Sequence, residues 1–462
     1  MSICPTSALY TREDGIVDFD TSSCIGCKSC MQACPYDALY IDPQDHTAQK
    51  CNYCAHRVDV GLQPACVVVC PEQAIVAGDL DDPDTKISKM VRSEKLSQRA
   101  VEQGTNPKLW YKSVESSNLD PLAATDPGDG GIWLDPASSW LNIDLTPPTV
   151  TATSASVTPT KPKNRVVYEG AAPPRIVYGK QTPAPWGWRV SSYFLTKGIS
   201  AGLVIALALA LLLGEDNTTG WARWGTPLVA GVFLALTGAL LVADLKRPDR
   251  FYYLLTRGNP GSWLVRGAWI LSGYGAVLAV WFLLGIAGSG GVTEVVIWTG
   301  AVLGIGVAGY TAFLFAQAEG RDLWQSPMLL WHMVAGAFAA GGGFGLVVSL
   351  VIEVGETTER AFGWSMVFGA AVLGLFAFAE LVTRHPNRNI AEAVHHMTRG
   401  AFATEWWLGG QLSGVVAPVA LGVVFLGGAG NWVGALGGVA ACAGIWFADD
   451  AFVKAGQSVP LA

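Results

Sequence analysis

Apolar runs long enough to cross a membrane recur along the chain from about residue 190 onward. Each contains roughly 20 residues, the length that a helix needs to span the hydrocarbon core of a bilayer. Short polar stretches separate the runs, and so many of them in series cannot all be buried in one soluble core. The pattern predicts eight transmembrane helices at residues 191–214, 225–245, 265–287, 293–317, 328–352, 362–383, 409–427 and 431–450.

Glycine is abundant inside these runs, above all in Gly341-Gly-Gly-Phe-Gly345. Small residues let helix backbones approach each other closely in lipid, so this stretch predicts tight helix packing. The membrane domain is assigned to residues 191–450, and residues 451–462 are expected to form a C-terminal tail.

Residues 82–190 differ from both neighbours, because they are rich in Pro, Ser, Thr, Asp and Gly. Such a composition predicts a long, mostly irregular arm. Its aromatic residues favour contact with a surface, since disordered tails contain few aromatics; a plain tether is the alternative. These aromatic residues are Trp110, Tyr111, Trp133, Trp140, Tyr168 and Tyr178.

Composition separates the two ends of the chain further. Hydrophobic residues make up 51% of the sequence and charged residues 15%, whereas nine of the ten cysteines precede residue 71. The formal net charge is −7 and the basic residues form no stripe, which excludes a nucleic-acid-binding footprint. Residues 1–81 are therefore assigned to a separate cysteine-rich domain.

The first complete cysteine motif runs from Cys24 through Cys27 and Cys30 to Cys34-Pro35. In this C-x2-C-x2-C-x3-C-P pattern three thiolates bind one [4Fe–4S] cluster and the fourth reaches another cluster. A second motif repeats the scheme with a longer insertion: Cys51, Cys54, Cys66 and Cys70-Pro71. Two C-x2-C pairs also suit zinc, but the C-x3-C-P endings favour iron–sulfur clusters.

Cys4-Pro5 is a third C-P ending, and the stretch after it resembles the one that follows Pro35. The cysteine expected four residues earlier would fall before Met1. We therefore expect that Met1 is an internal methionine and the domain N-terminally incomplete, or that further cysteine groups come from elsewhere in a complex.

With these motifs in place, residues 1–80 resemble the last half of the four-cluster ferredoxin subunits, such as polysulfide reductase B, that accompany molybdopterin oxidoreductases. The rest resembles the NrfD and polysulfide reductase C family of membrane proteins. The matching stretches are Asp244-Leu-Lys-Arg-Pro248, Ser262-Trp-Leu-Val-Arg266-Gly-Ala-Trp, Tyr310-Thr-Ala, Gly320-Arg-Asp-Leu-Trp324-Gln-Ser-Pro327, Thr398-Arg-Gly400 and Trp406-Trp-Leu-Gly. The implied fold is an α-helical membrane bundle preceded by a small α+β ferredoxin-like domain.

Two cluster pairings stay open. The resemblance implies that Cys4 joins Cys24, Cys27 and Cys30 in one cluster, which leaves the other five cysteines in need of ligands beyond this sequence. The two-cluster ferredoxin pairing instead joins Cys70 to Cys24, Cys27 and Cys30, and Cys34 to the second motif, which leaves Cys4 over. Two [4Fe–4S] clusters are expected, and more if upstream cysteine groups exist.

The resemblance implies electron transfer between the clusters and a membrane quinone, with a molybdopterin-type catalytic subunit as partner. No constellation of Cys, Ser or carboxylate residues suggests substrate chemistry on this chain, so no catalytic residue is assigned. Tyr310 matches a tyrosine that the family uses at its quinol pocket, and Lys197 and Asp244 are expected at the same depth. An ion pair of Asp244 with Arg247 is the structural alternative.

Other functions remain possible alternatives: a structural anchor without quinone chemistry, or an ion-translocating subunit using Asp244, Glu319, Glu380 and Asp449. Should the first pocket fail, His332 with Glu380 is the next place for a quinone. Because His332 is the only histidine in the predicted spans and two haems need four axial ligands, no haem is expected. Cys442 is expected to serve packing.

Lysines and arginines indicate the orientation. With eight spans, both termini share one side, and the basic residues favour that side strongly, which predicts that it is cytoplasmic. We therefore expect a multi-pass protein of the inner membrane with a cytoplasmic iron–sulfur head. The basic residues on that side are Arg175, Lys180, Arg189, Lys246, Arg247, Arg250, Arg257, Arg266, Arg321, Arg384, Arg388 and Arg399, against Arg223 and Arg360 opposite.

Overall fold

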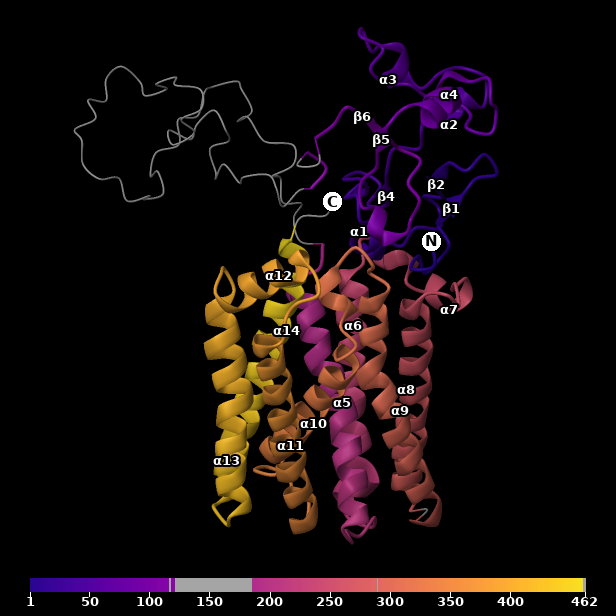
Figure 1. Cartoon of the computed structure of the whole chain (residues 1–462). Coiled ribbons are helices and arrows are strands. Elements are labelled where there is room, and N and C mark those ends of the chain that lie inside the picture. The colour runs from indigo at the N-terminus through magenta and orange to yellow at the C-terminus, as the bar shows by residue number, and fades with distance from the viewer. Residues whose placement is uncertain (116–117, 121–184, 289, 460–462) are drawn as a thin grey trace, which may run out of the picture. The chain divides into compact units, whose positions relative to one another are not determined.

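In the described part of the chain, eight helices after residue 187 are long and apolar enough to cross a membrane. The computed structural model describes residues 1–115, 118–120, 185–288 and 290–459. Figure 1 shows the long helices side by side as a bundle. They are α5 (Trp188–Leu212), α6 (Thr226–Asp244) with the π-helical turn η5 (Trp221–Gly225) before it, α8 (Trp263–Ala287), α9 (Gly290–Ala316), α10 (Leu329–Val348), α11 (Glu356–Val382), the π-helical η8 (Glu405–Val416) continued by α13 (Ala417–Leu426), and α14 (Asn431–Ser458).

The predicted spans are confirmed, with differences at their ends. The fifth ends at Val348 rather than residue 352, and the last continues to Ser458, so that most of the expected tail is helical. Asp449 and Asp450 lie inside this helix, at the predicted end of the span. Both carboxylates have partners inside the protein, His332 for Asp449 and Lys454 for Asp450, which removes the reason for the helix to stop.

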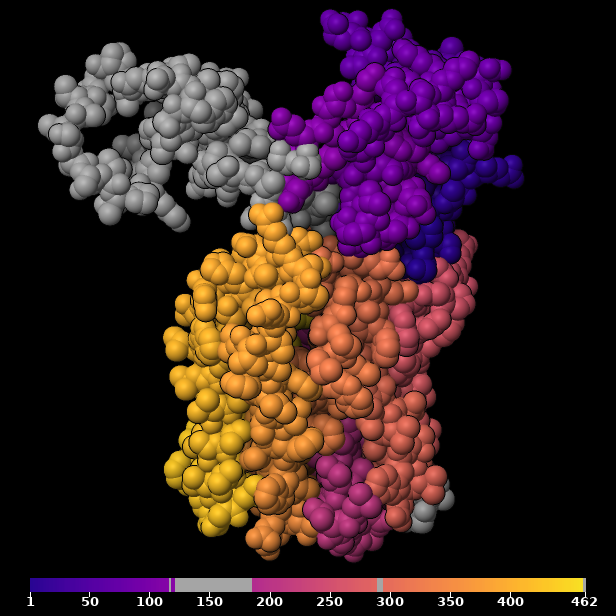
Figure 2. Space-filling model, viewed as in Figure 1, coloured from indigo at the N-terminus to yellow at the C-terminus, as the bar shows by residue number. Residues whose placement is uncertain are grey.

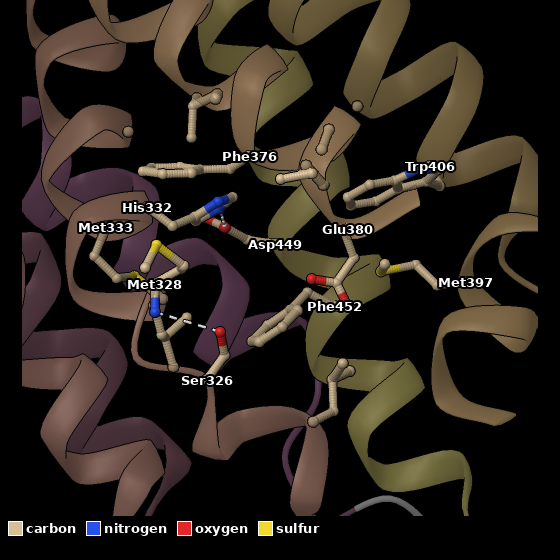
Figure 3. A pocket seen from close by; sticks show the side chains of 18 of the residues that line it. Ser326, Met328, His332, Met333, Phe376, Glu380, Met397, Trp406, Asp449 and Phe452 are labelled. Carbon is tan, nitrogen blue, oxygen red and sulfur yellow. Dashed lines mark hydrogen bonds and ion pairs between the residues drawn. The ribbon is translucent and has the colours of Figure 1, made fainter. Parts of the chain in front are cut away.

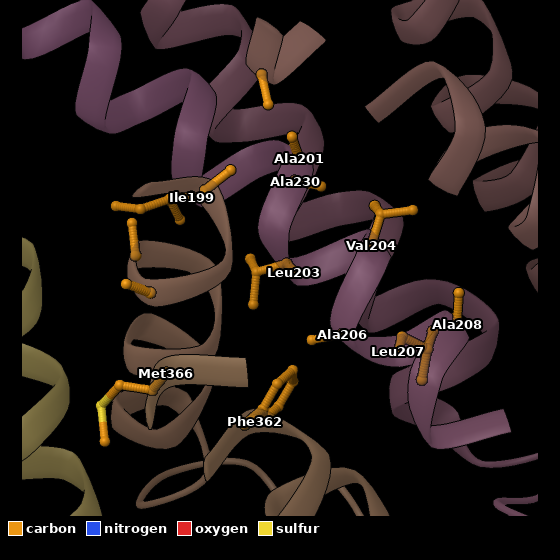
Figure 4. Close-up of a cluster of buried hydrophobic side chains, with 14 of the residues drawn as sticks. Ile199, Ala201, Leu203, Val204, Ala206, Leu207, Ala208, Ala230, Phe362 and Met366 are labelled. Atoms are coloured by element: carbon orange, nitrogen blue, oxygen red, sulfur yellow. The ribbon is translucent and has the colours of Figure 1, made fainter. Parts of the chain in front are cut away.

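Helix α5 lies at the centre of the bundle and packs against α6, α9, α10, α11 and α14. Its side chains Leu203 and Leu207 are fully buried in the main hydrophobic cluster, with Phe362 and Met366 of α11 in the same cluster (Figure 4). Helices at the rim keep apolar side chains such as Val232 and Leu283 exposed, as expected where lipid takes the place of a protein neighbour.

Glycines set the closest crossing, between α5 and α10. A methyl group on Gly202 would overlap the carbonyl of Ala337, and one on Gly341 would overlap the backbone of Gly202. Only residues without a Cβ allow this approach, as the glycine-rich stretch predicted.

Replacing Gly341 by Ala is therefore expected to lower the thermal unfolding midpoint of the detergent-purified protein. Overpacking costs about 1–3 kcal/mol, and here the obstacle is backbone, which cannot swing aside. Gly336→Ala is the matched control, because Gly336 lies in the same helix with open space around its Cα. Equal unfolding midpoints for the two variants would contradict the packing argument.

Short helices connect the spans on the side of the bundle that meets the cysteine-rich head. One of them, α12, is capped by the Asn387 side chain, which accepts a hydrogen bond from the N–H of Ile390 at 2.9 Å. These connections are η6 (Pro248–Arg250), α7 (Tyr253–Thr256), η7 (Asp322–Gln325) and α12 (Arg388–Thr398).

The cysteine-rich domain is built from short strands and helices, which confirms the predicted small α+β domain. Its strands form two antiparallel hairpins, with Tyr10 opposite Asp18 and Tyr40 opposite Gln49. The elements are β1 (Leu9–Thr11), β2 (Val17–Phe19), α1 (Ser29–Ala33), β3 (Tyr40–Ile41), β4 (Ala48–Gln49), α2 (Ala55–Val58), α3 (Ala65–Val68) and α4 (Lys86–Ser93).

The described residues 91–115 and 118–120 belong to a second unit, distinct from the one that joins residues 1–90 to the helix bundle. Within it, β5 (Leu96–Ser97) pairs antiparallel with β6 (Tyr111–Lys112), and η1 (Val101–Gln103) lies between them. Most of the predicted arm, with Trp133, Trp140, Tyr168 and Tyr178, lies outside the described residues.

Candidate functional site

Four cysteines from two separate stretches converge in the head. Cys4, Cys24 and Cys30 share one small buried cluster of side chains. Burial, with Cys4 and Cys24 as neighbours, raises the pKa of the Cys27 thiol to about 12. Burial and the same neighbours also raise the pKa of Cys30 well above its ordinary value. Such thiols ionise when a bound metal supplies positive charge, because coordination deprotonates a thiol outright.

The set suits a [4Fe–4S] cluster better than a single ion. Four cysteine thiolates are the usual ligands of such a cluster. In the part of the chain that the structure describes, no three His, Cys, Asp or Glu side chains are close enough to share one ion. A [4Fe–4S] cluster is larger than a single metal ion, so its four thiolate ligands lie further apart than those of one ion. Left-handed backbone at Gly26 and Lys28 (φ 67° and 64°) allows the tight turns between the ligands.

Five further cysteines of the head lie outside this set: Cys34, Cys51, Cys54, Cys66 and Cys70. Cys51 and Cys66 are exposed. Hydrogen bonds from backbone N–H groups lower the pKa of Cys70, and the N–H of Ile75 contributes most. Figure 1 shows α3, which Cys70 follows, at the opposite end of the head from α1, where Cys30 lies. The fourth sulfur beside Cys24, Cys27 and Cys30 is thus that of Cys4.

The helix bundle holds the four-cysteine loop by its backbone carbonyl groups. The N–H groups of Lys246 and Arg247 donate to the carbonyls of Gly26 and Ile25 at 3.1 and 3.2 Å. The Arg250 guanidinium donates to the carbonyl of Cys24 at 2.9 Å.

Two further contacts reach the other ligands. The Asn259 amide donates to the carbonyl of Cys4 at 3.0 Å, and the Trp186 indole N–H donates to that of Cys27 at 3.3 Å. Three of the four cysteines are therefore bound through their carbonyl groups by residues at the edge of the bundle.

Lys28, inside the ligand loop, forms an ion pair with Asp244, the last residue of α6. Its Nζ lies 3.0 and 2.9 Å from the two carboxylate oxygens, and the side chains are only 6% and 16% exposed. Arg247, which the sequence suggested as a partner of Asp244, instead binds Asp249 at 2.9 Å. Asp244 is thus engaged with the head, and it is not among the residues that line the cavity described next.

A cavity of about 770 Å³ lies inside the bundle, with a wall formed mainly by α5, α10, α11, η8 and α14 and completed by η7, α12 and the connections beside them. Figure 2 shows this face of the bundle hollowed between the coral and orange segments. The wall is mainly apolar with a few polar groups, as in binding sites for small apolar molecules. Its polar side chains include Lys197, His332, Glu380, His385, Gln411 and Asp449, and its apolar ones include Met328, Met333, Phe376, Met397, Trp406 and Phe452.

His332 and Asp449 lie next to each other in the wall of this cavity (Figure 3). The imidazole Nε2 lies 3.6 Å from a carboxylate oxygen of Asp449, whose side chain is 6% exposed. The His332 ring stands between Phe376 and Phe452, each 6.5 Å away between ring centroids. A partly buried histidine paired with a buried carboxylate beside an apolar cavity can hold and donate a proton.

Lys197 reaches the cavity from α5, and it is 1% exposed. Its Nζ donates to the carbonyl of Ala308 at 2.9 Å and to the hydroxyl of Thr311 at 2.5 Å. The same nitrogen lies 5.0 Å from the ring centroid of Tyr310, a cation–π contact. Tyr310 is buried behind Lys197 and is not part of the cavity wall. The structure thus brings Tyr310 and Lys197 together and places Asp244 elsewhere.

Aromatic rings connect the four-cysteine loop to the cavity wall. Trp186, which binds the carbonyl of Cys27, lies 5.1 Å from Phe315 between ring centroids. Phe315 lies 5.4 Å from Phe194, and Phe194 lines the cavity. The loop and the cavity are thus joined by a short run of packed side chains.

Several of these residues were not assigned from the sequence. Asp449 was named only as a relay candidate and His332 only as a second choice, and nothing in the sequence marked Trp186. A carboxylate inside an apolar run is the signal that pointed to Asp449, because intramembrane charge usually marks a site. Trp186 sits in the Pro-rich arm and offered no comparable signal.

Comparison with known families divides the chain as its composition does. The family model described as "Polysulphide reductase, NrfD" matches residues 177–459. The model described as "4Fe-4S dicluster domain" matches residues 1–80.

Individual relatives match the head. The B subunit of the tetrathionate reductase of Salmonella typhimurium is 41% identical over 122 residues, which cover 26% of this chain and 49% of that protein. The B component of the polysulfide reductase of Wolinella succinogenes is 45% identical over 111 residues, 24% of this chain and 58% of that protein. The protein NrfC of Escherichia coli is 39% identical over 112 residues, 24% and 50% respectively. The chain spans about half the length of these relatives.

Proposed function

Because this protein belongs to the NrfD family of polysulphide reductase membrane proteins, fused to a [4Fe–4S] head, we propose that it passes electrons between iron–sulfur clusters and a membrane quinone or quinol. Multi-pass membrane anchoring and electron transfer follow from the two family matches. The quinone chemistry is the step that we add.

We assign the cluster next to the bundle to Cys4, Cys24, Cys27 and Cys30, whose thiols converge and are anchored by the bundle. When bound, the cluster supplies one-electron transfer. The remaining five cysteines, Cys34, Cys51, Cys54, Cys66 and Cys70, are proposed as ligands of further clusters.

The quinone is placed in the cavity of α5, α10, α11, η8 and α14. A quinone headgroup needs hydrogen-bond partners for its carbonyls and takes up two protons on reduction. His332 with Asp449 provides a proton store, and Lys197 provides a buried cation at the same wall. Since His332 is engaged with Asp449, it is not assigned as a haem ligand.

The observation that carries this proposal is the run of rings from Trp186 through Phe315 to Phe194, which joins the cysteine loop to the cavity. An electron must cross from the cluster to the quinone, and close packing over the whole distance favours that transfer. In this proposal Tyr310 influences the quinone site through its contact with Lys197. Asp244 influences the cluster through its ion pair with Lys28 of the head.

The partners and orientation rest on the same family membership and on the charges of the chain. A molybdopterin-type catalytic subunit is proposed as the partner, because the relatives that match the head include subunits of tetrathionate and polysulfide reductases. The excess of lysine and arginine on the side of the head supports a cytoplasmic head and a position in the inner membrane.

Reduction of the clusters with dithionite, removal of the reductant and addition of decylubiquinone or menadione tests the function. In membranes that contain the protein, the reduced-cluster signal in electron paramagnetic resonance (EPR) should disappear faster with quinone than with buffer alone. Membranes without the protein provide the background rate. If neither quinone accelerates reoxidation, the proposed quinone chemistry is wrong and a structural anchor is favoured.

A further inference from the structure

The ion pair of Lys28 and Asp244 sits at an unusual place for two charges. Lys28 lies between the ligands Cys27 and Cys30, and its side chain is almost wholly buried. Asp244 ends α6, where the helix dipole disfavours a negative charge. The pair thus places two charges, largely shielded from water, beside the cysteine loop.

We propose that Lys28 and Asp244 set the reduction potential of the cluster at Cys4, Cys24, Cys27 and Cys30, and that they do so with opposite signs. The proposal rests on the cluster assignment above and not on the quinone. Reduction adds one electron to the cluster and makes it more negative. A buried ammonium in the ligand loop stabilises that added charge, and a buried carboxylate beside the ammonium opposes it.

Burial makes the effect large enough to matter. Exposed charges around a cluster are screened by water and salt, whereas charges at 6% and 16% exposure are screened much less. Three other basic residues lie near the loop. Lys246 is exposed, Arg247 is bound to Asp249, and Arg250 donates to the carbonyl of Cys24.

If the ion pair only held the head against the bundle, the expected effect of its loss on the reduction potential would differ. The ligand loop is held by the N–H groups of Lys246 and Arg247 and by the Arg250 guanidinium, none of which belongs to the ion pair. Neutralising one member should therefore leave the loop in place. If the pair were only a clamp, loss of either member would loosen the junction in the same way and shift the potential in the same direction.

The test is a potentiometric titration of the full-length protein, monitored by EPR. Lys28→Met should lower the midpoint of this cluster, and Asp244→Asn should raise it. We expect the ratio of reduced to oxidised cluster at a fixed potential to change about tenfold in each case, equivalent to about 59 mV for one electron. The double variant should lie near the wild type, and Lys28→Arg should keep the wild-type midpoint.

Lys246→Met is the matched control, since Lys246 is less buried than Lys28 and adjoins the same loop, and its midpoint shift should be small. Shifts of equal sign for Lys28→Met and Asp244→Asn, or no shift in either, would overturn the proposal. Cys27→Ser identifies the signal: if that variant leaves every EPR signal intact, the cluster assignment itself is wrong, an outcome distinct from the failure of tuning.

Discussion

Replacing Cys4 by Ser is expected to remove the signal of the cluster next to the bundle and to lower the iron content of the purified protein by one cluster. Cys4 supplies the fourth sulfur beside Cys24, Cys27 and Cys30, and its carbonyl is bound by Asn259 of the bundle. Serine is a poor replacement for a thiolate ligand of iron. Iron analysis and EPR of the reduced protein measure the loss, and quinone-dependent reoxidation should fall with it.

Two controls make this result specific. Cys442→Ser changes a cysteine of α14 that packs against the carbonyl of Ala340 and should leave both iron and EPR unchanged. Cys70→Ser should spare the cluster next to the bundle. If that cluster is lost in Cys70→Ser and kept in Cys4→Ser, the two-cluster ferredoxin pairing is correct instead.

Asp449→Asn is expected to slow quinone turnover by about 10²-fold or more while the clusters stay intact. The carboxylate faces His332 at 3.6 Å in the cavity, and general acid–base groups commonly contribute factors of this size. The amide keeps the shape of the side chain but cannot carry the proton. The rate of reoxidation of the reduced clusters by decylubiquinone measures the effect.

Asp216→Asn is the matched control, because Asp216 lies in the connection between α5 and η5, outside the cavity. It should show the wild-type rate. A wild-type rate in Asp449→Asn, with wild-type cluster content, would exclude the His332–Asp449 pair as the proton store.

The spans were predictable because each depends on a local property of the sequence, its run of apolar residues. The cysteine motifs could be recognised for a similar reason, since the spacing within each motif is local. The sequence could not decide between Cys4 and Cys70 as the proposed fourth ligand, because that choice depends on how the chain folds back around Cys24. The resemblance to known ferredoxin subunits had kept the Cys4 pairing open.

The pairs that hold the site together lie far apart in the chain, which explains why sequence reasoning missed them. Lys28 and Asp244 are separated by 216 positions, and Arg247, closer in sequence, was the natural guess for a partner. Asp449 and His332 belong to different spans, and only helix packing shows that they face one cavity. Hydropathy determines which segments enter the membrane, but it carries no information on which helix faces meet.

The bundle binds the ligand loop through the carbonyl oxygens of the loop. This affects how the sequences of the head and the bundle can diverge in evolution. Carbonyl groups are the same in every residue, so substitutions in the side chains of the loop leave the bonds from Lys246, Arg247 and Arg250 in place. The contact between the loop and the bundle therefore tolerates changes of sequence as long as the path of the backbone is kept. Gly26 is the exception, because any side chain there would collide with Lys246.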